Sequence, residues 1–246
     1  MRRLDAPRGL RYWMLAGAMS AAHWAIAGEQ VYEPLGAAVR SALHGSVADR
    51  ASPKLVFGTQ REAKAWLSAM SARLAKHIPD AQTRVEFLTT VQYEAKRAGL
   101  DPQMVLGLIE VESRFRKYAV SRAGARGYMQ VMPFWIDLIG EADHDLFKLR
   151  INLRYGCVIL RHYLDAERGD IYRALSRYNG SLGSSDAYAV KVVRSWQSRW
   201  VFKPERRDVP TSGRTPGGAD RELRVRQVSG ESGHQVMPRA GGARSI

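Results

Sequence analysis

Two glutamates, Glu110 and Glu112, lie two residues apart in an apolar segment with the features of a helix. Asp101 can cap the start of this helix, and Pro102 suits its first position, where the missing N–H costs nothing. At about 100° per residue the following apolar residues share one face: Met104, Val105, Leu108, Ile109 and Phe115. Glu112 falls on the same face, and Glu110 lies about 200° away. We therefore expect Glu110 to be a solvated surface charge and Glu112 to be buried.

A carboxyl on the apolar face of a helix is costly unless it is protonated or well paired. Partial desolvation raises the pKa of such a carboxyl and retains its proton near neutral pH, which suits a general acid. The alternative for Glu112 is a structural carboxyl bonded to a backbone group or an arginine. The helix alone leaves both interpretations open.

A series of short motifs follows Glu112 along the chain. They are Glu112-Ser113, Ala119-Val120-Ser121, the run GARGYMQVMP at 124–133, NLRYG at 152–156, YNG at 178–180, and Tyr188 with Val192. In this order and spacing they resemble the soluble lytic transglycosylase (SLT) domain, a relative of goose-type lysozyme. The resemblance covers about residues 82–200.

The resemblance implies cleavage of the β-1,4 bond between N-acetylmuramic acid and N-acetylglucosamine in peptidoglycan, with Glu112 as the single general acid and base. Most glycosidases need two carboxyls. This family uses the C6 hydroxyl of the sugar as its nucleophile and leaves a 1,6-anhydro end. The other nearby acids are candidates for a second carboxyl only by their proximity in sequence: Asp137, Glu141, Asp143 and Asp145. No cofactor or metal is expected, and the six histidines form no pair at metal-ligand spacing.

The resemblance also implies substrate-binding roles, carried over position by position. Ser113 would steady the acid, Ser121 would touch the N-acetyl group, and Tyr188 would point at Glu112. The groove would be lined by Met129, Gln130, Met132, Tyr178 and Asn179. The alternative is a helix cap or core hydrogen bond for each polar residue, and core packing for the methionines. The chain departs from the family pattern at Lys117-Tyr118, Tyr128 and Arg177, which leaves subsite preference open.

The N-terminus has the features of a secretory signal peptide. Four arginines precede an apolar run from Tyr12 to about Ala22, and Ala25-Ile26-Ala27 is a small-residue cleavage site. These features predict cleavage before Gly28 and a periplasmic location. The alternative is an uncleaved N-terminal anchor. No later segment reaches the roughly 18 apolar residues of a membrane span, so no transmembrane domain is expected after cleavage.

The expected fold is all-α: one lysozyme-like catalytic domain with a helical N-terminal extension and a disordered C-terminal tail. The divisions are a signal peptide at 1–27, the extension at 28–81, the lytic transglycosylase domain at 82–202 and a basic tail at 203–246. The tail has too few apolar residues to fold. Helices are expected at 60–77, 80–98, 128–139, 149–166 and 171–178, and after Ser184 or Ser185. In the second of these, Val85, Leu88, Val91 and Ala95 should face inward.

The formal net charge of +14 favours a polyanionic partner. We expect that partner to be the glycan strands of peptidoglycan. Nucleic-acid binding is not expected, because it would rest on charge alone. Two alternatives remain: a lysozyme-type hydrolase, or an inactive wall-binding or assembly protein. The chain is expected to be a monomer. The sequence leaves open whether it serves wall turnover or acts with a secretion or pilus assembly of the cell envelope.

Overall fold

The computed structural model describes residues 30–48 and 50–203. The predicted signal peptide and the basic tail beyond Lys203 lie outside the described residues. Within them the fold is all-α, as predicted, and the β-type pairing is limited to isolated bridges of Arg126 with Val120 and Val131. The helices are α1 (Ala37–Val47), α2 (Gln60–Leu74), α3 (Ala81–Arg97), α4 (Pro102–Ser113), α5 (Phe134–Ile139), α6 (Leu149–Ala166), α7 (Ile171–Asn179), α8 (Ala187–Ser195) and the π-helical turn η1 (Trp196–Trp200).

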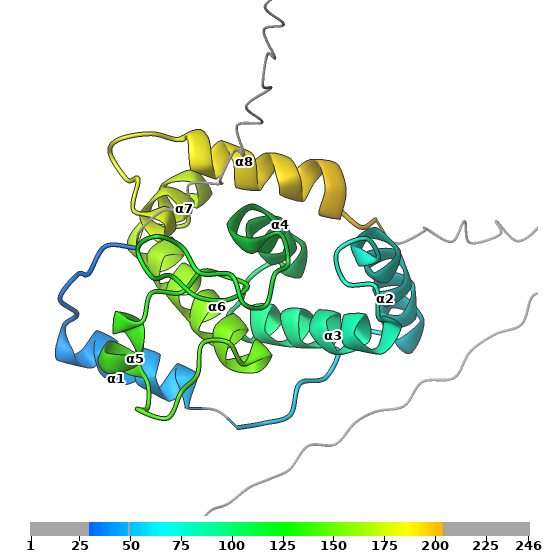
Figure 1. Ribbon diagram of the computed structural model, residues 1–246, viewed down its shortest axis with the longest axis horizontal. Coiled ribbons are helices and arrows are strands. Elements are labelled where there is room, and N and C mark those ends of the chain that lie inside the picture. The colour runs from blue at the N-terminus through cyan, green and yellow to red at the C-terminus, as the bar shows by residue number, and fades with distance from the viewer. Residues whose placement is uncertain (1–29, 49, 204–246) are drawn as a thin grey trace, which may run out of the picture. The chain divides into compact units, whose positions relative to one another are not determined.

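Helix α4 carries Glu112 and lies among the other helices, below α8 and above α3 in Figure 1. Its residues Leu106, Leu108 and Ile109 are fully buried, which explains the strongly apolar sequence. At Gly107 an added Cβ would lie 2.8 Å from the backbone nitrogen of Trp196, so α4 and η1 approach each other closely. This packing holds α4 firmly against the C-terminal helices.

The segment before α3 packs against the later helices. Val47, Trp66 and Met70 are buried in the same hydrophobic core as the residues of α4 and α6. The Gln92 side chain also donates a 2.6 Å hydrogen bond to the carbonyl of Val56 and accepts one from its N–H at 2.9 Å. The described part of the predicted extension is therefore integrated with the helices that follow it.

A buried ion-pair network joins α3 to α6. Glu94, whose side chain is 1% exposed, accepts hydrogen bonds from Arg154 Nη2 at 2.9 Å and Arg154 Nε at 3.3 Å. Arg97 and Arg150 also lie within ion-pair distance, at 3.2 and 3.6 Å. A buried carboxylate requires this kind of compensation. Glu94 is thus a structural carboxylate that fixes α3 against α6.

Two local predictions were wrong. Residues 128–130 form a turn, Val131 forms a bridge with Arg126, and the predicted helix at 128–139 begins only at Phe134. Gln130 has a φ of 48°, which an α-helix does not accommodate. Val85 on α3 is 44% exposed, because the buried face of α3 includes Phe87 instead.

Glu110 was also misplaced by the sequence analysis. Its side chain is only 11% exposed, and it accepts hydrogen bonds from Ser195 Oγ at 2.6 Å and Trp200 Nε1 at 3.0 Å. It also pairs with Arg199. The periodicity of α4 placed Glu110 away from the core correctly, but α8 and η1 cover that side of the helix.

None of the helices among the described residues is long and apolar enough to cross a membrane.

Candidate functional site

Glu112 occupies the last turn of α4 because of signals at both ends of that helix. At the start, Asp101 Oδ1 accepts a 2.7 Å hydrogen bond from the N–H of Gln103, and Pro102 takes the first helical position. At the end, Arg114 and Phe115 both have positive φ values, 51° and 62°, which stop the helix directly after Glu112 and Ser113. The Glu112 carboxyl is therefore presented from a rigid helix end.

The carboxyl of Glu112 is 6% exposed, as the sequence predicted for a residue on the apolar face. Its Oε1 accepts a hydrogen bond from Tyr188 Oη on α8, and its Oε2 is buried without a partner among the described residues. Burial raises the pKa of Glu112 to about 8, although the Tyr188 hydrogen bond acts in the opposite direction. Burial also raises the pKa of Tyr188, so the phenol keeps the proton that it donates. Glu112 is thus protonated at neutral pH.

Tyr178 and Asn179 are the last two residues of α7. Tyr178 is 1% exposed and donates a 2.7 Å hydrogen bond from its hydroxyl to the carbonyl of Met129. The pKa of Tyr178 is raised first by burial and then by the charge of Glu112. Asn179 is 8% exposed, and its Nδ2 has no hydrogen-bond partner among the described residues. An unpaired buried amide can donate to a ligand.

Three polar residues of the predicted site bond to backbone instead. Ser113 Oγ donates to the carbonyl of Ile109 at 3.2 Å, and Ser121 Oγ accepts from the N–H of Ala125 at 3.0 Å. Gln130 Nε2 donates to the carbonyls of Ala119 at 3.1 Å and Gly127 at 2.9 Å. The bonds of Ser121 and Gln130 hold the loop between α4 and α5, whereas the bond of Ser113 lies within α4. The structure does not show a bond from any of the three to Glu112.

Asn152 on α6 anchors the turn at 128–130, a role that the sequence analysis missed. Its Oδ1 accepts from the N–H of Met129 at 2.8 Å, and its Nδ2 donates to the carbonyls of Arg126 at 2.8 Å and Leu146 at 2.9 Å. Asn152 is fully buried, and its side chain makes three hydrogen bonds to backbone groups, which fix the position of the turn. The signal was present, because Asn152 opens one of the family motifs, but its partners could not be read from the sequence.

Met129 is fully buried and packs directly on α6. At Gly156 an added Cβ would lie 2.3 Å from Met129 Sδ, so only glycine leaves room for this methionine. Met132 is partly buried, and its N–H donates to Gln30 Oε1 at 3.2 Å. Gln30 precedes α1 and is outside every motif, so the sequence contained no signal for its position beside Met132.

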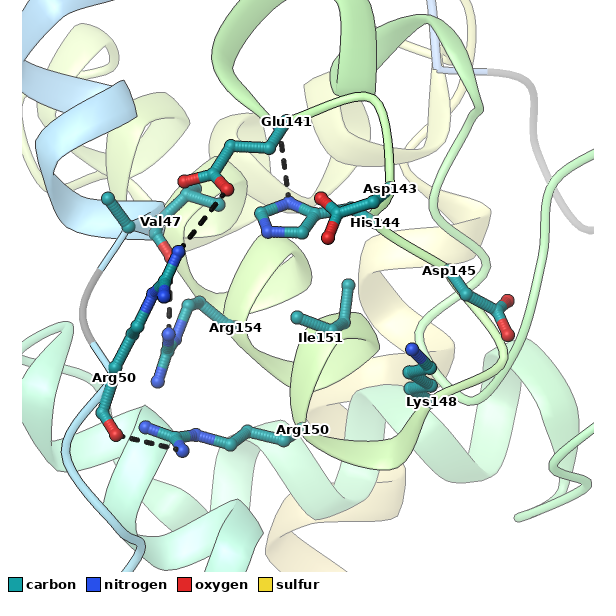
Figure 2. Close-up of a pocket in the computed structure, with 11 residues that line it drawn as sticks. Val47, Arg50, Glu141, Asp143, His144, Asp145, Lys148, Arg150, Ile151 and Arg154 are labelled. Atoms are coloured by element: carbon teal, nitrogen blue, oxygen red, sulfur yellow. Dashed lines mark hydrogen bonds and ion pairs between the residues drawn. The ribbon is translucent and has the colours of Figure 1, made fainter.

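A second group of acids lines a different cavity, of about 400 Å³. Figure 2 shows Glu141, Asp143 and His144 on one loop of this cavity, and their potential ligand atoms lie within 4.8 Å of one another. Arg50 lies 3.6 Å from Glu141, and Arg154 lines the same cavity. These positive charges oppose the binding of a metal cation. Glu112 is not among the lining residues, so Glu141 and Asp143 belong to a separate surface feature.

Together, the fold and the site define an all-helical domain with one protonated, buried carboxyl at a helix end. Residues 89–194 match the family model described as the transglycosylase SLT domain. The matched residues include Glu112 and most of the motifs, so the resemblance inferred from the motifs is confirmed.

Among curated proteins, the chain is 26% identical to membrane-bound lytic murein transglycosylase C of Mannheimia succiniciproducens over 147 residues, 48% of this chain and 40% of that protein. It is 48% identical to the protein of the same name from Haemophilus ducreyi over 115 residues, 40% of this chain and 31% of that protein. The chain thus spans less than half the length of these relatives.

Among solved structures, an inactive mutant of the lytic transglycosylase Slt from Pseudomonas aeruginosa matches with 19% identity and a TM-score of 0.36. The match covers 57% of this chain and 27% of the Slt chain.

Proposed function

We propose that this protein is a peptidoglycan lytic transglycosylase that cleaves the bond between N-acetylmuramic acid and N-acetylglucosamine, with Glu112 as its single acid and base. The observation that carries the proposal is the Glu112 carboxyl, which is buried, bonded to Tyr188 and shifted to a pKa of about 8. The SLT domain and the names of the curated relatives support the same activity.

In the first step, protonated Glu112 donates its proton to the glycosidic oxygen as the bond from that oxygen to C1 breaks. The electron pair of the bond leaves with the oxygen, and the N-acetyl carbonyl of the same sugar stabilises the cationic centre at C1. A carboxyl with a raised pKa is suited to this role, because it holds a proton at neutral pH and can transfer it to the leaving oxygen as that oxygen becomes basic in the transition state.

In the second step, the Glu112 carboxylate takes the proton of the C6 hydroxyl, and the C6 oxygen forms a bond to C1. The carboxyl is thereby returned to its protonated state, and the product has a 1,6-anhydro ring. Water is not consumed. Because the nucleophile belongs to the sugar already bound, the entropic cost of bringing it to C1 is small. Tyr188 supports this step, since its hydroxyl stabilises the carboxylate form of Glu112.

The substrate would lie against residues from α7 and the loop between α4 and α5. Asn179 has an unpaired buried amide that can donate to a sugar oxygen, and Tyr178 positions the loop by bonding Met129. We assign partly buried Met132 to the groove; Met129, predicted as a groove residue, is fully buried and supports the loop from within. Ser113 and Ser121 shape the backbone around the site. For Gln130 the role is to fix the loop, because both of its observed bonds are to loop carbonyls.

The test is incubation with purified peptidoglycan, followed by mass spectrometry of the soluble products. A transglycosylase yields muropeptides with 1,6-anhydro ends, lighter by one water than the reducing ends made by a lysozyme-type hydrolase. Glu112→Gln should release no products, whereas Asp165→Asn, which alters a surface pair with Arg161, should behave as the wild type. Reducing ends would favour the hydrolase. Binding to peptidoglycan without any product would favour the inactive wall-binding protein.

We further propose that the protein acts in the periplasm after removal of residues 1–27. Two relatives carry the word membrane-bound in their names, which is consistent with a protein of the cell envelope. N-terminal sequencing of the periplasmic fraction should begin at Gly28. A retained Met1 in the membrane fraction would support the anchor instead.

A further inference from the structure

The residues before α1 lie against the proposed site. We call residues 30–36 the N-terminal segment; in Figure 1 it starts near α7 and runs to α1. Gln30 Oε1 accepts the 3.2 Å bond from the N–H of Met132, and the ring of Tyr32 meets that of Phe134 edge-on at 5.6 Å. Two successive contacts thus join the N-terminal segment to the loop that enters α5.

A third contact joins the N-terminal segment to α7. Glu33 forms an ion pair with Arg177, with 3.5 Å between Glu33 Oε1 and Arg177 Nε. Arg177 directly precedes Tyr178 in the sequence. Burial and then the charge of Glu112 raise the pKa of Tyr178. The Gln30 side chain lies near enough to the Tyr178 hydroxyl to act in the opposite direction. Gln30 therefore neighbours both Met132 and Tyr178, two residues that we place in the glycan site.

The two ends of the Gln30 amide differ in their partners. The N–H of Met132 needs an acceptor, so Oε1 must face Met132 and Nε2 must point the other way. Gln30 is 4% exposed, and Nε2 is buried without a hydrogen bond among the described residues. A buried amide donor without a partner is costly, and such groups in native proteins call for an explanation. Asn179 Nδ2 and Glu112 Oε2 are in the same condition.

We propose that Gln30 is a substrate-binding residue whose Nε2 donates a hydrogen bond to an oxygen of the glycan, and that the N-terminal segment forms one wall of the glycan site. The inference rests on the proposed function. The oxygen belongs to the acetamide carbonyl or to a hydroxyl of the same sugar. Either acceptor complements an amide donor whose orientation Met132 has already fixed.

The test measures binding separately from cleavage. In the Glu112→Gln protein, the dissociation constant of an N-acetylglucosamine tetramer is measured by calorimetry with Gln30 intact and with Gln30→Met. Loss of one hydrogen bond should weaken binding about tenfold, equivalent to ~1.4 kcal/mol. Val31→Ala, on a side chain that is 54% exposed in the same segment, should change binding by less than about twofold.

A second comparison identifies the sugar oxygen. With a de-N-acetylated glucosamine tetramer, the difference between Gln30 and Gln30→Met should vanish if the acceptor is the acetamide carbonyl. It should persist if the acceptor is a hydroxyl. Gln30→Asn keeps the amide but shortens the side chain and withdraws the donor, so it should weaken binding even if Gln30→Met fails to fold.

Three outcomes would overturn the inference. Unchanged binding in Gln30→Met would show that the donor is not used, and tighter binding would show that the N-terminal segment covers the groove. Glu33→Gln breaks the pair with Arg177 and leaves the Gln30 amide in place. If it weakened glycan binding as much as Gln30→Met does, attachment of the segment, and not the amide donor, would set the affinity. The proposed function fails separately, if the protein with Gln30 intact neither binds the tetramer nor releases anhydro products.

Discussion

Tyr188 Oη donates a hydrogen bond to Glu112 Oε1 and thereby joins α8 to the last turn of α4. Both residues are buried. Among the described residues, Tyr188 is the hydrogen-bond partner of the Glu112 carboxyl. Glu94 makes the contrast clear, since that buried carboxylate meets the guanidinium groups of three arginines. A phenol, unlike a guanidinium, supports the carboxyl without forcing it to ionise. The difference separates a structural carboxylate from a proton donor.

Removing the Tyr188 hydroxyl should change the acidity of Glu112. Because this hydrogen bond lowers the pKa of Glu112, Tyr188→Phe should raise that pKa further above about 8. The basic limb of the pH–rate profile should move to higher pH. The maximal rate should fall about tenfold, because the carboxylate formed in the first step loses ~1.4 kcal/mol of support.

Single-turnover cleavage of a short glycan across pH measures both effects of Tyr188→Phe. Tyr172→Phe is the matched control, since Tyr172 is 47% exposed. A basic limb that stays in place in Tyr188→Phe would mean that the hydroxyl does not act on Glu112.

The stability of the protein should depend on pH through Glu112. Burial raises the pKa of Glu112 from 4.5 to about 8, so between these values the folded protein holds a proton that the unfolded chain has released. The stabilisation that comes from the protonated Glu112 carboxyl is fully present below pH 4.5 and is lost as pH rises through about 8. Glutamine has no such proton. The melting temperature of Glu112→Gln relative to the wild type should therefore increase between about pH 5 and pH 8 and then level off.

Differential scanning fluorimetry at a series of pH values measures this difference in melting temperature. Glu86→Gln, at an exposed position of α3, should show no trend of this kind. A constant difference between Glu112→Gln and the wild type would contradict the raised pKa.

Glu110→Gln should destabilise the protein and leave the chemical step intact. The sequence suggested a neutral change, but Glu110 accepts from Ser195 and Trp200 and pairs with Arg199. Charged hydrogen bonds to a largely buried carboxylate contribute about 1–3 kcal/mol, so a loss of that size is expected in urea denaturation. Asp165→Asn, in an exposed pair with Arg161, should cost less than about 1 kcal/mol. A large loss of the single-turnover rate in Glu110→Gln would place Glu110 in the catalytic chemistry.

Gly156→Ala should displace Met129 and loosen the turn that Tyr178 contacts. The new Cβ would lie 2.3 Å from Met129 Sδ and 2.8 Å from Met129 Cβ, so the methionine must move. Overpacking of this kind costs about 1–3 kcal/mol, measured as a lower midpoint of denaturation. Gly45→Ala is the matched control, because its Cβ meets nothing within 4 Å on helix α1. That control should be neutral or stabilising by about 0.5–1 kcal/mol, and equal losses in the two variants would refute the packing argument.

The sequence by itself determined the helices whose signals are local. The span Leu149–Ala166 was predicted with its observed ends, and Asp101 caps α4 as expected. Asp170 likewise caps α7, the helix predicted to begin at residue 171. Gly180 ends α7 with a φ of 77°, as a glycine after a helix should. Caps, stops and apolar periodicity act within a few residues, so they can be read without a fold. The buried position of Glu112 followed from the same periodicity.

The tertiary structure decided what depends on residues far apart in the chain. Glu110 is outside the apolar face of α4, and only the return of α8 and η1 covers it. The turn at 128–130 is held by Asn152 on α6, which overrides the helical pattern of the residues between Tyr128 and Ile139. Gln30 reaches Met132 across 102 positions of sequence. Periodicity reports which side of a helix is apolar, but burial depends on what packs against the other side, and that is fixed only when distant elements meet.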